Sequence, residues 1–534
     1  MKRVEPNLTD PLIIAEDEHL LVVLKPAGMN THSPAPHAGE GIYDWLRHRE
    51  PRWASLAIIH RLDKETSGVM VFGKTPLANR SLTEQFAEHT IRKRYLLRTD
   101  RPVKASAFTA ESAIVRSGER YLSRPLHAGA DRAETHFKVL SRENGVALVE
   151  AVPVTGRTHQ IRVHAAEHGF PILGDTLYGG SDWSRLCLHA SSLTLQHPAT
   201  GETVTFEAPA CFERDSRQSL RAAIVDPAET NAFRVVHGAS DGWPGWYVER
   251  LGEYLLSQSE ASLTPGQSEH LRSFPGVRGV YHKTLNRHVR RTAVTDVCPQ
   301  LVSGDAAPER FAIRENGVQF EMSFQEGYSV GLFLDQRDNR RRFLVNHVAA
   351  GFPLLASGLE GAEVLNAFAY TCGFSVCAAK AGARTTSLDL SKKYLDWGRR
   401  NFALNGLDPA AHDFIFGDVF DWFRRLAKKQ RMYEVIVLDP PTFSQSKEHG
   451  AFRAEKDYGK LIEAALRLLK PDGVLLASTN AAMLEPERFL EMILDAARAS
   501  GRRILQEHYV PQPPDFPISR AEPAYLKTVW LRFA

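Results

Sequence analysis

Apolar residues in the first part of the chain occur mostly in short alternating or continuous runs, a pattern typical of β-strands. Residues 11–23 predict two strands around an acidic turn, and residues 146–154 predict a third. Two further runs, 57–59 and 69–72, enclose a polar stretch. Residues 158–167 predict a helix that begins at a Thr N-cap. These strands with few helices predict an α+β fold.

The pattern changes in the middle of the chain. Residues 213–229 are polar and Arg-rich and predict a linker that becomes helical around 216–224. Residues 230–312 then predict short strands separated by glycine-containing turns, a small β-rich domain. The aromatic residues within 243–247 fit a hydrophobic core better than a base-stacking surface.

The last part of the chain alternates strands with helices. Residues 364–365 end a strand, residues 366–373 form a loop, and residues 375–381 open a helix. The next strand, 385–388, delivers Asp389 to its carboxyl end, at the distance where an acid reaches a ribose in doubly wound folds. The loop lacks the three-glycine phosphate fingerprint, so a ligand with a ribose but no pyrophosphate fits better than a dinucleotide.

The residues that follow continue the alternation of strands and helices, which is typical of an α/β fold. A helix is predicted up to the Asn-Gly stop at 405–406, and Asp418 follows another strand. The β-branched run 435–438 predicts a buried parallel strand that ends in Asp439-Pro440-Pro441-Thr442-Phe443-Ser444. Two prolines stiffen the backbone where this strand meets the predicted cleft, although such a sequence can also simply end a strand.

Composition limits the class of protein. A length of 534 residues predicts three or four domains, and 43% hydrophobic with 24% charged residues is typical of a globular protein. The sequence shows neither a membrane-span nor an export pattern, and its five cysteines lack zinc-type spacing, so we expect a cytoplasmic protein without a metal. The net charge of +3 means that any nucleic-acid site depends on local basic patches.

The polar stretch between the two strands holds the first candidate catalytic residue. In His60-Arg61-Leu62-Asp63-Lys64-Glu65-Thr66-Ser67-Gly68, Asp63 lies between two cationic residues. Their charge favours the ionised carboxylate that nucleophilic attack requires. Considered alone, the stretch also fits an ordinary solvated turn.

This nine-residue stretch resembles the signature loop of the RluA-type pseudouridine synthases, in which the Asp is catalytic. Lys93-Arg94-Tyr95 resembles the family segment whose aromatic residue packs on the target base. Residues 155–164 resemble the segment whose final Arg, here Arg162, pairs with the catalytic Asp. The resemblance implies isomerisation of uridine to pseudouridine in RNA without a cofactor, carried out by Asp63, Tyr95 and Arg162.

Weaker matches extend the resemblance from about residue 11 to about 209. They are residues 25–29, 169–175, Tyr178 and 186–190. We therefore expect a pseudouridine synthase domain over residues 1–212, with no room before it for the small basic RNA-binding domain that some family members carry.

Residues 313–534 resemble the S-adenosylmethionine-dependent methyltransferases, and more narrowly the large-subunit rRNA methyltransferases of the RlmI and RlmK types. The resemblance rests on Leu365-Asn366, residues 368–371, Asp389-Leu390-Ser391 and Asp439 to Ser444. It implies a Rossmann-like domain with S-adenosyl-L-methionine as cofactor. The implied cofactor-binding residues are Asn366, Phe368, Tyr370, Gly373, Asp389, Asp418, Asp439 and Pro440, with Asp439 also beside the target base.

An absent cysteine limits the methylated atom. Methylation at carbon 5 of a pyrimidine needs a cysteine thiolate that adds to the ring. The RlmI type uses a cysteine after the strand that ends in Asp-Pro-Pro or after the next strand. In this sequence no cysteine follows Cys377. The absence leaves a ring or exocyclic nitrogen as the methyl acceptor. Asp439-Pro440-Pro441-Thr442-Phe443 resembles the RlmK type, and this resemblance implies nitrogen 7 of a guanine in 23S rRNA, with the exocyclic amine of guanine as second choice.

The whole sequence predicts a bifunctional RNA-modifying enzyme acting on ribosomal RNA, with tRNA as an alternative substrate. No membrane and no obligate protein partner are expected. Two rival interpretations are an RNA-binding or ribosome assembly factor with an inactive catalytic half, and a metabolite methyltransferase.

Overall fold

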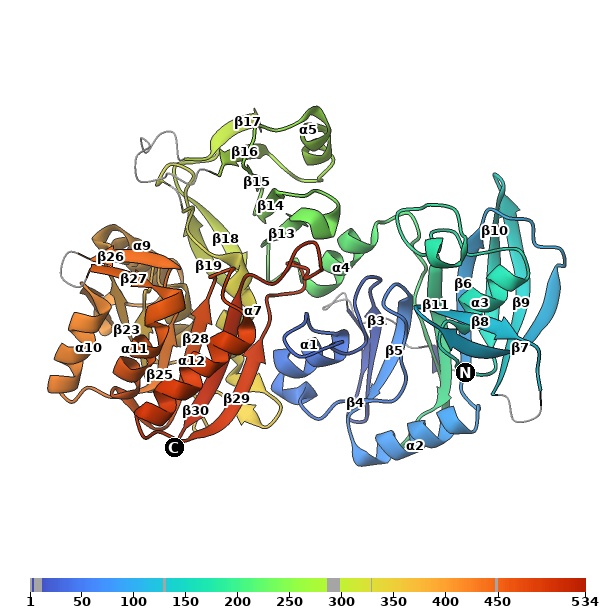
Figure 1. The fold of residues 1–534 in the computed structure, drawn as a ribbon, viewed down its shortest axis with the longest axis horizontal. Helices are drawn as coiled ribbons and strands as arrows, with labels where there is room; N and C mark the ends of the chain where they lie inside the picture. The colour runs from blue at the N-terminus through green and yellow to red at the C-terminus, as the bar shows by residue number, and fades with distance from the viewer. Residues whose placement is uncertain (1, 4–11, 128–130, 286–297, 328, 447–449) are drawn as a thin grey trace. The chain divides into compact units, whose positions relative to one another are not determined.

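The computed structural model describes residues 2–3, 12–127, 131–285, 298–327, 329–446 and 450–534 (Figure 1). Contacts divide the chain into two units. The first contains residues 1–34, 40–45 and 55–226, and the second contains residues 35–39, 46–54 and 227–534. Among the residues described, no helix is long and apolar enough to cross a membrane.

The first unit is built on one twelve-stranded sheet. Its strands are β1 (Lys2–Arg3), β2 (Ile13–Glu16), β3 (Leu20–Lys25), β4 (Ala57–Ile58), β5 (Ser67–Gly73), β6 (Arg92–Thr99), β7 (Ala107–Ser117), β8 (Arg120–Arg124), β9 (Arg132–Glu143), β10 (Val146–Pro153), β11 (Leu188–Gln196) and β12 (Thr203–Glu207). Its helices are α2 (Pro76–Ala87), α3 (Gln160–Glu167) and α4 (Ser216–Ile224), while α1 (Ile42–Arg49) crosses the division between the units.

The strand order of this sheet is β2-β3-β5-β11-β6-β10-β9-β7-β8, with β12 on β11 and β4 on β5. Most pairs are antiparallel, but β5 and β11 run parallel where Ser67 faces His189 and Gly68 faces Ala190. One hydrophobic cluster packs α2 against β3, β5 and β11. A second packs α3 against β6, β9 and β10. The residues discussed below lie where these two parts of the sheet meet.

The second unit begins with a small β-rich region. Strands β13 (Ala232–His237), β14 (Trp246–Leu251), β15 (Tyr254–Ser259), β16 (Gly279–Thr284) and β17 (Gln300–Gly304) form one sheet, which α5 (Pro265–Arg272) accompanies. Trp246 is fully buried in its core, as the sequence predicts. Strands β18 (Phe311–Glu315) and β19 (Val318–Met322) form a hairpin that follows.

The rest of the second unit is a seven-stranded sheet in the order β24-β23-β22-β25-β28-β30-β29. Its strands are β22 (Glu363–Ala367), β23 (Arg384–Asp389), β24 (Asp413–Phe416), β25 (Tyr433–Leu438), β28 (Leu469–Thr479), β29 (Ile504–Val510) and β30 (Lys527–Phe533). Strands β22, β23, β24, β25 and β28 are parallel to one another. Strand β30 is antiparallel to its neighbours β28 and β29. Two short hairpins, β20 (His347–Ala349) with β21 (Phe352–Pro353) and β26 (Phe443–Ser446) with β27 (Gly450–Arg453), lie outside it.

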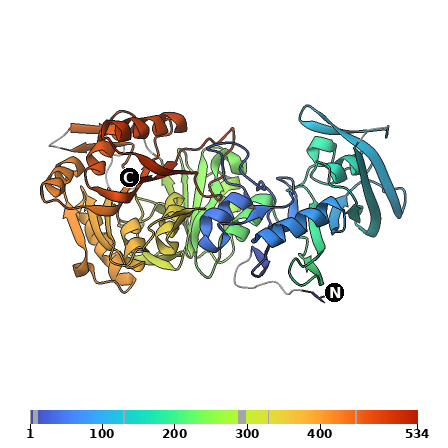
Figure 2. The same cartoon turned by 90° about the horizontal axis from the view of Figure 1, so that it is seen from below.

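Helices cover both faces of this sheet (Figure 2). One core joins α7 (Arg337–Val345), α8 (Gly373–Lys380) and α9 (Lys392–Leu404) to strand residues such as Val364 and Val435. The other joins α10 (Val419–Lys428), α11 (Ala454–Leu466) and α12 (Pro486–Ala499) to their neighbours Leu365 and Ile436. Because successive strand side chains point to opposite faces, a strand buried on both sides is apolar throughout, which is why 435–438 is a continuous apolar run.

Most of the predicted elements agree with the structure, and one boundary is wrong. The strands predicted within 11–23 are β2 and β3, and the helix predicted at 216–224 is α4. The helix predicted to start at a Thr N-cap begins instead at Gln160, after a left-handed His159 with φ 57°. A residue with positive φ cannot continue a helix backwards, so residues 158–159 belong to the preceding turn.

Gly68, in β5, is a position where the backbone geometry requires glycine. Its φ is +131°, and a Cβ there would lie 2.3 Å from the carbonyl oxygen of Ala190. The close approach of β5 and β11 therefore requires glycine, and it holds the loop before β5 against β11.

Gly68→Ala is expected to destabilise this part of the sheet by about 2–4 kcal/mol, because overpacking costs about 1–3 kcal/mol and the unfavourable φ costs about 1 kcal/mol more. Gly118→Ala is the matched control, since Gly118 also has a positive φ (+62°) but nothing lies within 4 Å of its Cβ position. Amide hydrogen exchange of β5 and β11 should accelerate at least about tenfold in the first variant only. Equal amide protection in both variants would show that the close approach of β5 and β11 does not determine the stability of this part of the sheet.

Candidate active sites

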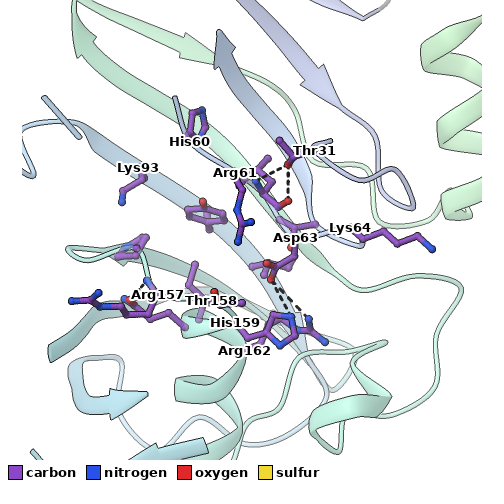
Figure 3. Close-up of a pocket in the computed structure, with 18 of the residues that line it drawn as sticks. Thr31, His60, Arg61, Asp63, Lys64, Lys93, Arg157, Thr158, His159 and Arg162 are labelled. Carbon is purple, nitrogen blue, oxygen red and sulfur yellow. Dashed lines mark hydrogen bonds and ion pairs between the residues drawn. The ribbon is translucent and has the colours of Figure 1, made fainter. Parts of the chain in front are cut away.

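A cavity of about 740 Å³ opens in the first unit around Asp63 (Figure 3). Its lining includes residues 30–32 after β3, residues 59–64 after β4, residues 93 and 95 of β6, and residues 155–162 at the start of α3. The structure thus brings Asp63, Tyr95 and Arg162 into one cavity, as the sequence predicts. Their convergence follows from the sheet order, which places β5, β11 and β6 side by side.

The loop that carries Asp63 is fastened to the segment after β3. The ammonium of Lys25, fully buried, donates to the carbonyl oxygens of Pro26, Met29 and Lys64 at 2.8, 2.6 and 3.1 Å. Burial lowers the pKa of Lys25 to about 7. The Thr31 hydroxyl donates to the Leu62 carbonyl at 2.9 Å. These bonds hold the backbone on both sides of Asp63, so its side chain is presented rigidly.

Aromatic and cationic side chains form another wall of the cavity. Tyr95 is half-buried, and its burial, with Asp63 nearby, raises the pKa of its hydroxyl, which stays protonated. Burial lowers the pKa of the Lys93 ammonium. His60 accepts a hydrogen bond from the Val71 amide at 3.1 Å, and burial, then Lys93, lowers its pKa to about 3. His60 is therefore neutral and structural, whereas Tyr95 and Lys93 offer a flat ring and a cation to an occupant.

Arg162 has a main partner that differs from the predicted one. Its Nε and Nη2 donate to Asp175 Oδ2 and Oδ1 at 2.7 and 2.8 Å, a buried bidentate pair. Its Nη1 lies 3.8 Å from Asp63 Oδ2. The expected pairing with Asp63 is thus an ion-pair contact without a hydrogen bond. His159 Nε2 also approaches Asp63 Oδ2, at 3.9 Å.

A second set of predicted residues lies at the carboxyl edge of the seven-stranded sheet. Asp389 ends β23, and its two oxygens accept the amides of Tyr370 and Ser391, each at 2.8 Å. Burial raises the pKa of Asp389. Asp418 follows β24 and caps α10, with Oδ1 accepting the amides of Phe420 and Asp421. Both acids are therefore held in fixed orientations beside the same edge.

The loop between β22 and α8 has an unusual backbone. Phe368, Tyr370 and Cys372 all adopt positive φ values of 61°, 49° and 64° without being glycine. Such conformations cost about 1–3 kcal/mol each and cluster at ligand sites. Gly373 starts α8, where a Cβ would lie 2.9 Å from Leu332. Asn366, predicted to contact the cofactor, is 1% exposed and donates to Ser375 Oγ at 2.9 Å, so it supports the loop from behind.

Asp439 follows β25, and its side chain lies among polar groups. Gln336 Nε2 donates to its Oδ2 at 3.2 Å and to Ser478 Oγ at 2.8 Å. Burial, then the nearby Asp335, raises the pKa of Asp439 to about 7. Pro440 behind it is buried, whereas Thr442 is exposed and donates to Asn480 Oδ1 at 2.7 Å. Asp439 thus lies between a structural network and an accessible edge.

Large apolar side chains remain exposed along this edge. Leu390 directly follows Asp389 and is 41% exposed, and Phe416 at the end of β24 is 49% exposed. Phe333 and Phe443 are 52% and 43% exposed. Apolar rings beside fixed carboxylates suit a ligand with a flat heterocycle and sugar hydroxyls.

Sequence reasoning missed several of these residues. It assigned no role to Asp175, His159 or Lys25, each of which contacts at least one residue from another segment of the chain. It also gave no role to Leu390 and Phe416, although a large apolar residue next to a strand-end acid is a usable signal.

Comparisons with known proteins support both halves. Residues 19–167 match the family model for RNA pseudouridylate synthase, and residues 276–532 match the model for S-adenosylmethionine-dependent methyltransferase. The resemblances found in the sequence are therefore confirmed, as are the fold class and the cofactor of the second half.

Individual relatives match the methyltransferase. The chain is 35% identical over 331 residues to a ribosomal RNA large subunit methyltransferase of Deinococcus radiodurans, covering 60% of this chain and 77% of that protein. It is 33% identical to ribosomal RNA large subunit methyltransferase I of Aeromonas hydrophila, covering 59% and 78%. The crystal structure of SMU.776 complexed with SAH is 29% identical with a TM-score of 0.50, covering 59% of this chain and 79% of that one.

Proposed function

Because the chain belongs to the large-subunit ribosomal RNA methyltransferase family and also carries a pseudouridylate synthase domain, we propose that it makes two modifications in RNA. The first half isomerises uridine to pseudouridine. The second methylates nitrogen 7 of a guanine in 23S rRNA. The observation that carries the synthase half is the convergence of Asp63, Tyr95 and Arg162 on one cavity.

The cavity suits a single nucleotide taken out of its helix. Its volume of about 740 Å³ is in the range of small-molecule sites, and bases that undergo chemistry are flipped out of the stack. Isomerisation breaks the bond from C1′ to N1, forms a bond from C1′ to C5, removes the C5 proton and adds a proton at N1. No electrons are gained or lost, so no cofactor is needed. Asp63 would attack, Tyr95 would pack on the base, and Lys93 would approach the phosphate.

The carboxyl edge of the second sheet fits S-adenosylmethionine. Asp389 would bind the ribose hydroxyls, Leu390 and Phe416 would flank the adenine, and Asp418 would lie at its edge. The strained loop, with Phe368, Tyr370 and Gly373, would receive the methionine part. The bound cofactor supplies an electrophilic methyl group, which a neutral ring nitrogen attacks once it is positioned.

The state of the cysteines supports a nitrogen as the methyl acceptor. Cys372 and Cys377 are buried, and burial raises the pKa of both thiols, that of Cys372 to about 12, so neither forms a thiolate readily. The position after β28 holds Asn480. Asp439 and Phe443 would face the guanine, with the buried Pro440 behind them. On this proposal, this chain would differ from the relatives named methyltransferase I in the atom that it methylates.

Nucleoside analysis of RNA modified in vitro tests the methylated atom. RNA from cells lacking the protein would be treated with purified enzyme and cofactor, digested and separated. We expect N7-methylguanosine. N2-methylguanosine would support the second choice, the exocyclic amine, and 5-methylcytidine would contradict the argument from the cysteines.

Asp63→Asn and Asp63→Ala are both expected to abolish pseudouridine formation, because nucleophilic attack needs the carboxylate charge rather than the size of the side chain. Methylation should stay at the wild-type rate, since the two sites lie in different units. Asp182→Asn, at an exposed position outside the cavity lining, is the matched control. Normal turnover of uridine by the Asp63→Asn enzyme would exclude Asp63 as the nucleophile.

Asp389→Ala is expected to weaken S-adenosylmethionine binding by about tenfold or more, since charge-assisted hydrogen bonds contribute about 1.5–3 kcal/mol. Isothermal calorimetry on the intact chain measures this. Asp396→Ala removes an acid that is 63% exposed on α9 and should bind like the wild type. Unchanged affinity in the Asp389 variant would remove this residue from the cofactor site.

A further inference from the structure

Two nitrogen groups approach the catalytic candidate, and both face the same oxygen. Asp63 Oδ2 lies 3.8 Å from Arg162 Nη1 and 3.9 Å from His159 Nε2 (Figure 3). A carboxylate whose Oδ2 is held in place presents its other oxygen, Oδ1, in a defined direction. What fixes these two groups therefore determines how the nucleophile is aimed.

The guanidinium of Arg162 forms its hydrogen bonds with a residue other than Asp63. Its bidentate hydrogen bonds go to Asp175, whose side chain is 1% exposed, and its guanidinium lies 5.0 Å from the ring centre of Tyr178. A buried bidentate pair is rigid and its charges largely cancel. Arg162 thus cannot swing onto Asp63 without breaking this pair.

His159 is aimed at Asp63 by its backbone and by a tyrosine. It precedes α3 with φ 57°, a strained conformation for a residue other than glycine. Its Nδ1 lies 2.8 Å from the hydroxyl of Tyr178. That hydroxyl oxygen accepts the backbone amide of Tyr121 at 2.9 Å. Tyr178 does not line the cavity, so its contact with His159 is not a contact with the substrate.

These contacts select one form of the imidazole ring. Since the Tyr178 oxygen accepts from Tyr121, its own proton is available to His159 Nδ1. The ring proton then resides on Nε2, the atom that faces Asp63. The opposite tautomer would direct the lone pair of Nε2 at the carboxylate, which is unfavourable.

We propose that Tyr178 and His159 form a positioning pair for the proposed synthase reaction: Tyr178 sets the tautomer of His159, and His159 Nε2–H holds Asp63 Oδ2 so that Oδ1 faces the target nucleotide. The pair acts through Asp63 and transfers no group. The pair requires that this contact, 3.9 Å in the structure, shorten to a hydrogen bond when a nucleotide fills the cavity.

A double-mutant cycle tests the pair in the full-length protein. Tyr178→Phe keeps the ring beneath Arg162 and removes only the hydroxyl. His159→Gln places an amide nitrogen near the position of Nε2, and this donor needs no proton from Tyr178. Tyr121→Phe is the control, because it preserves both the backbone amide and the ring that packs 5.2 Å from His159. Pseudouridine formation would be followed with enzyme in excess over RNA, giving a maximal rate and a half-saturating concentration.

The expected result is a maximal rate reduced tenfold or more by Tyr178→Phe, with half-saturation changed less than twofold. His159→Gln should retain activity within fivefold of wild type, and adding Tyr178→Phe in that background should change the rate less than twofold. Tyr121→Phe should match the wild type.

Two outcomes would overturn the proposal. Wild-type rates for Tyr178→Phe would show that the hydroxyl is not needed. An equal loss in both the His159 and the His159→Gln backgrounds would show that Tyr178 only braces β8. Absence of pseudouridine with the wild-type enzyme would instead contradict the proposed function itself, so the two failures are distinguishable.

Discussion

The synthase site depends on one buried ammonium. Lys25 donates to three backbone carbonyls, and one of these belongs to the residue after Asp63. A buried cation is costly unless every donor is satisfied, so this arrangement forms only when the segment after β3 and the loop before β5 are both in place. Gly68 enforces the same condition from the other end of the loop, by its contact with β11. The loop that carries Asp63, the proposed nucleophile, is thus fixed by backbone contacts before any substrate arrives.

The second half obtains its rigidity differently. Parallel strands bring their carboxyl ends to one edge, where Asp389 ends β23, Asp418 follows β24 and Asp439 follows β25. Strained loop backbone and amide donors then orient Asp389, while Leu390 and Phe416 stay exposed beside it. In both halves the proposed site residues lie on well-packed elements or on short loops between them. The chemistry is correspondingly separate, and each unit contains all the residues proposed for its own reaction.

Local sequence was sufficient to place residues that lie at a fixed point beside a strand. Asp63 in its loop and Asp389 at the end of β23 are of this kind, because hydrophobic periodicity locates the strands. The partner of Arg162 was not predictable in this way. Asp175 lies in a different segment, and only tertiary packing brings the two together. The predicted N-cap of α3 is wrong because of the backbone. Thr158 is a favourable N-cap residue by type, but the left-handed His159 that follows it prevents the helix from extending back to Thr158.

The central claim is that one chain makes two chemically different modifications in RNA. Mass-spectrometric mapping of ribosomal and transfer RNA from cells with and without the protein tests it most directly. The account predicts that at least one pseudouridine in RNA and an N7-methylguanosine in 23S rRNA disappear together. It also predicts that the Asp63→Asn protein restores the methyl group but no pseudouridine, and that the Asp389→Ala protein restores the pseudouridine but less of the methyl group than the wild type. Unchanged modification at every position in cells lacking the protein would contradict it.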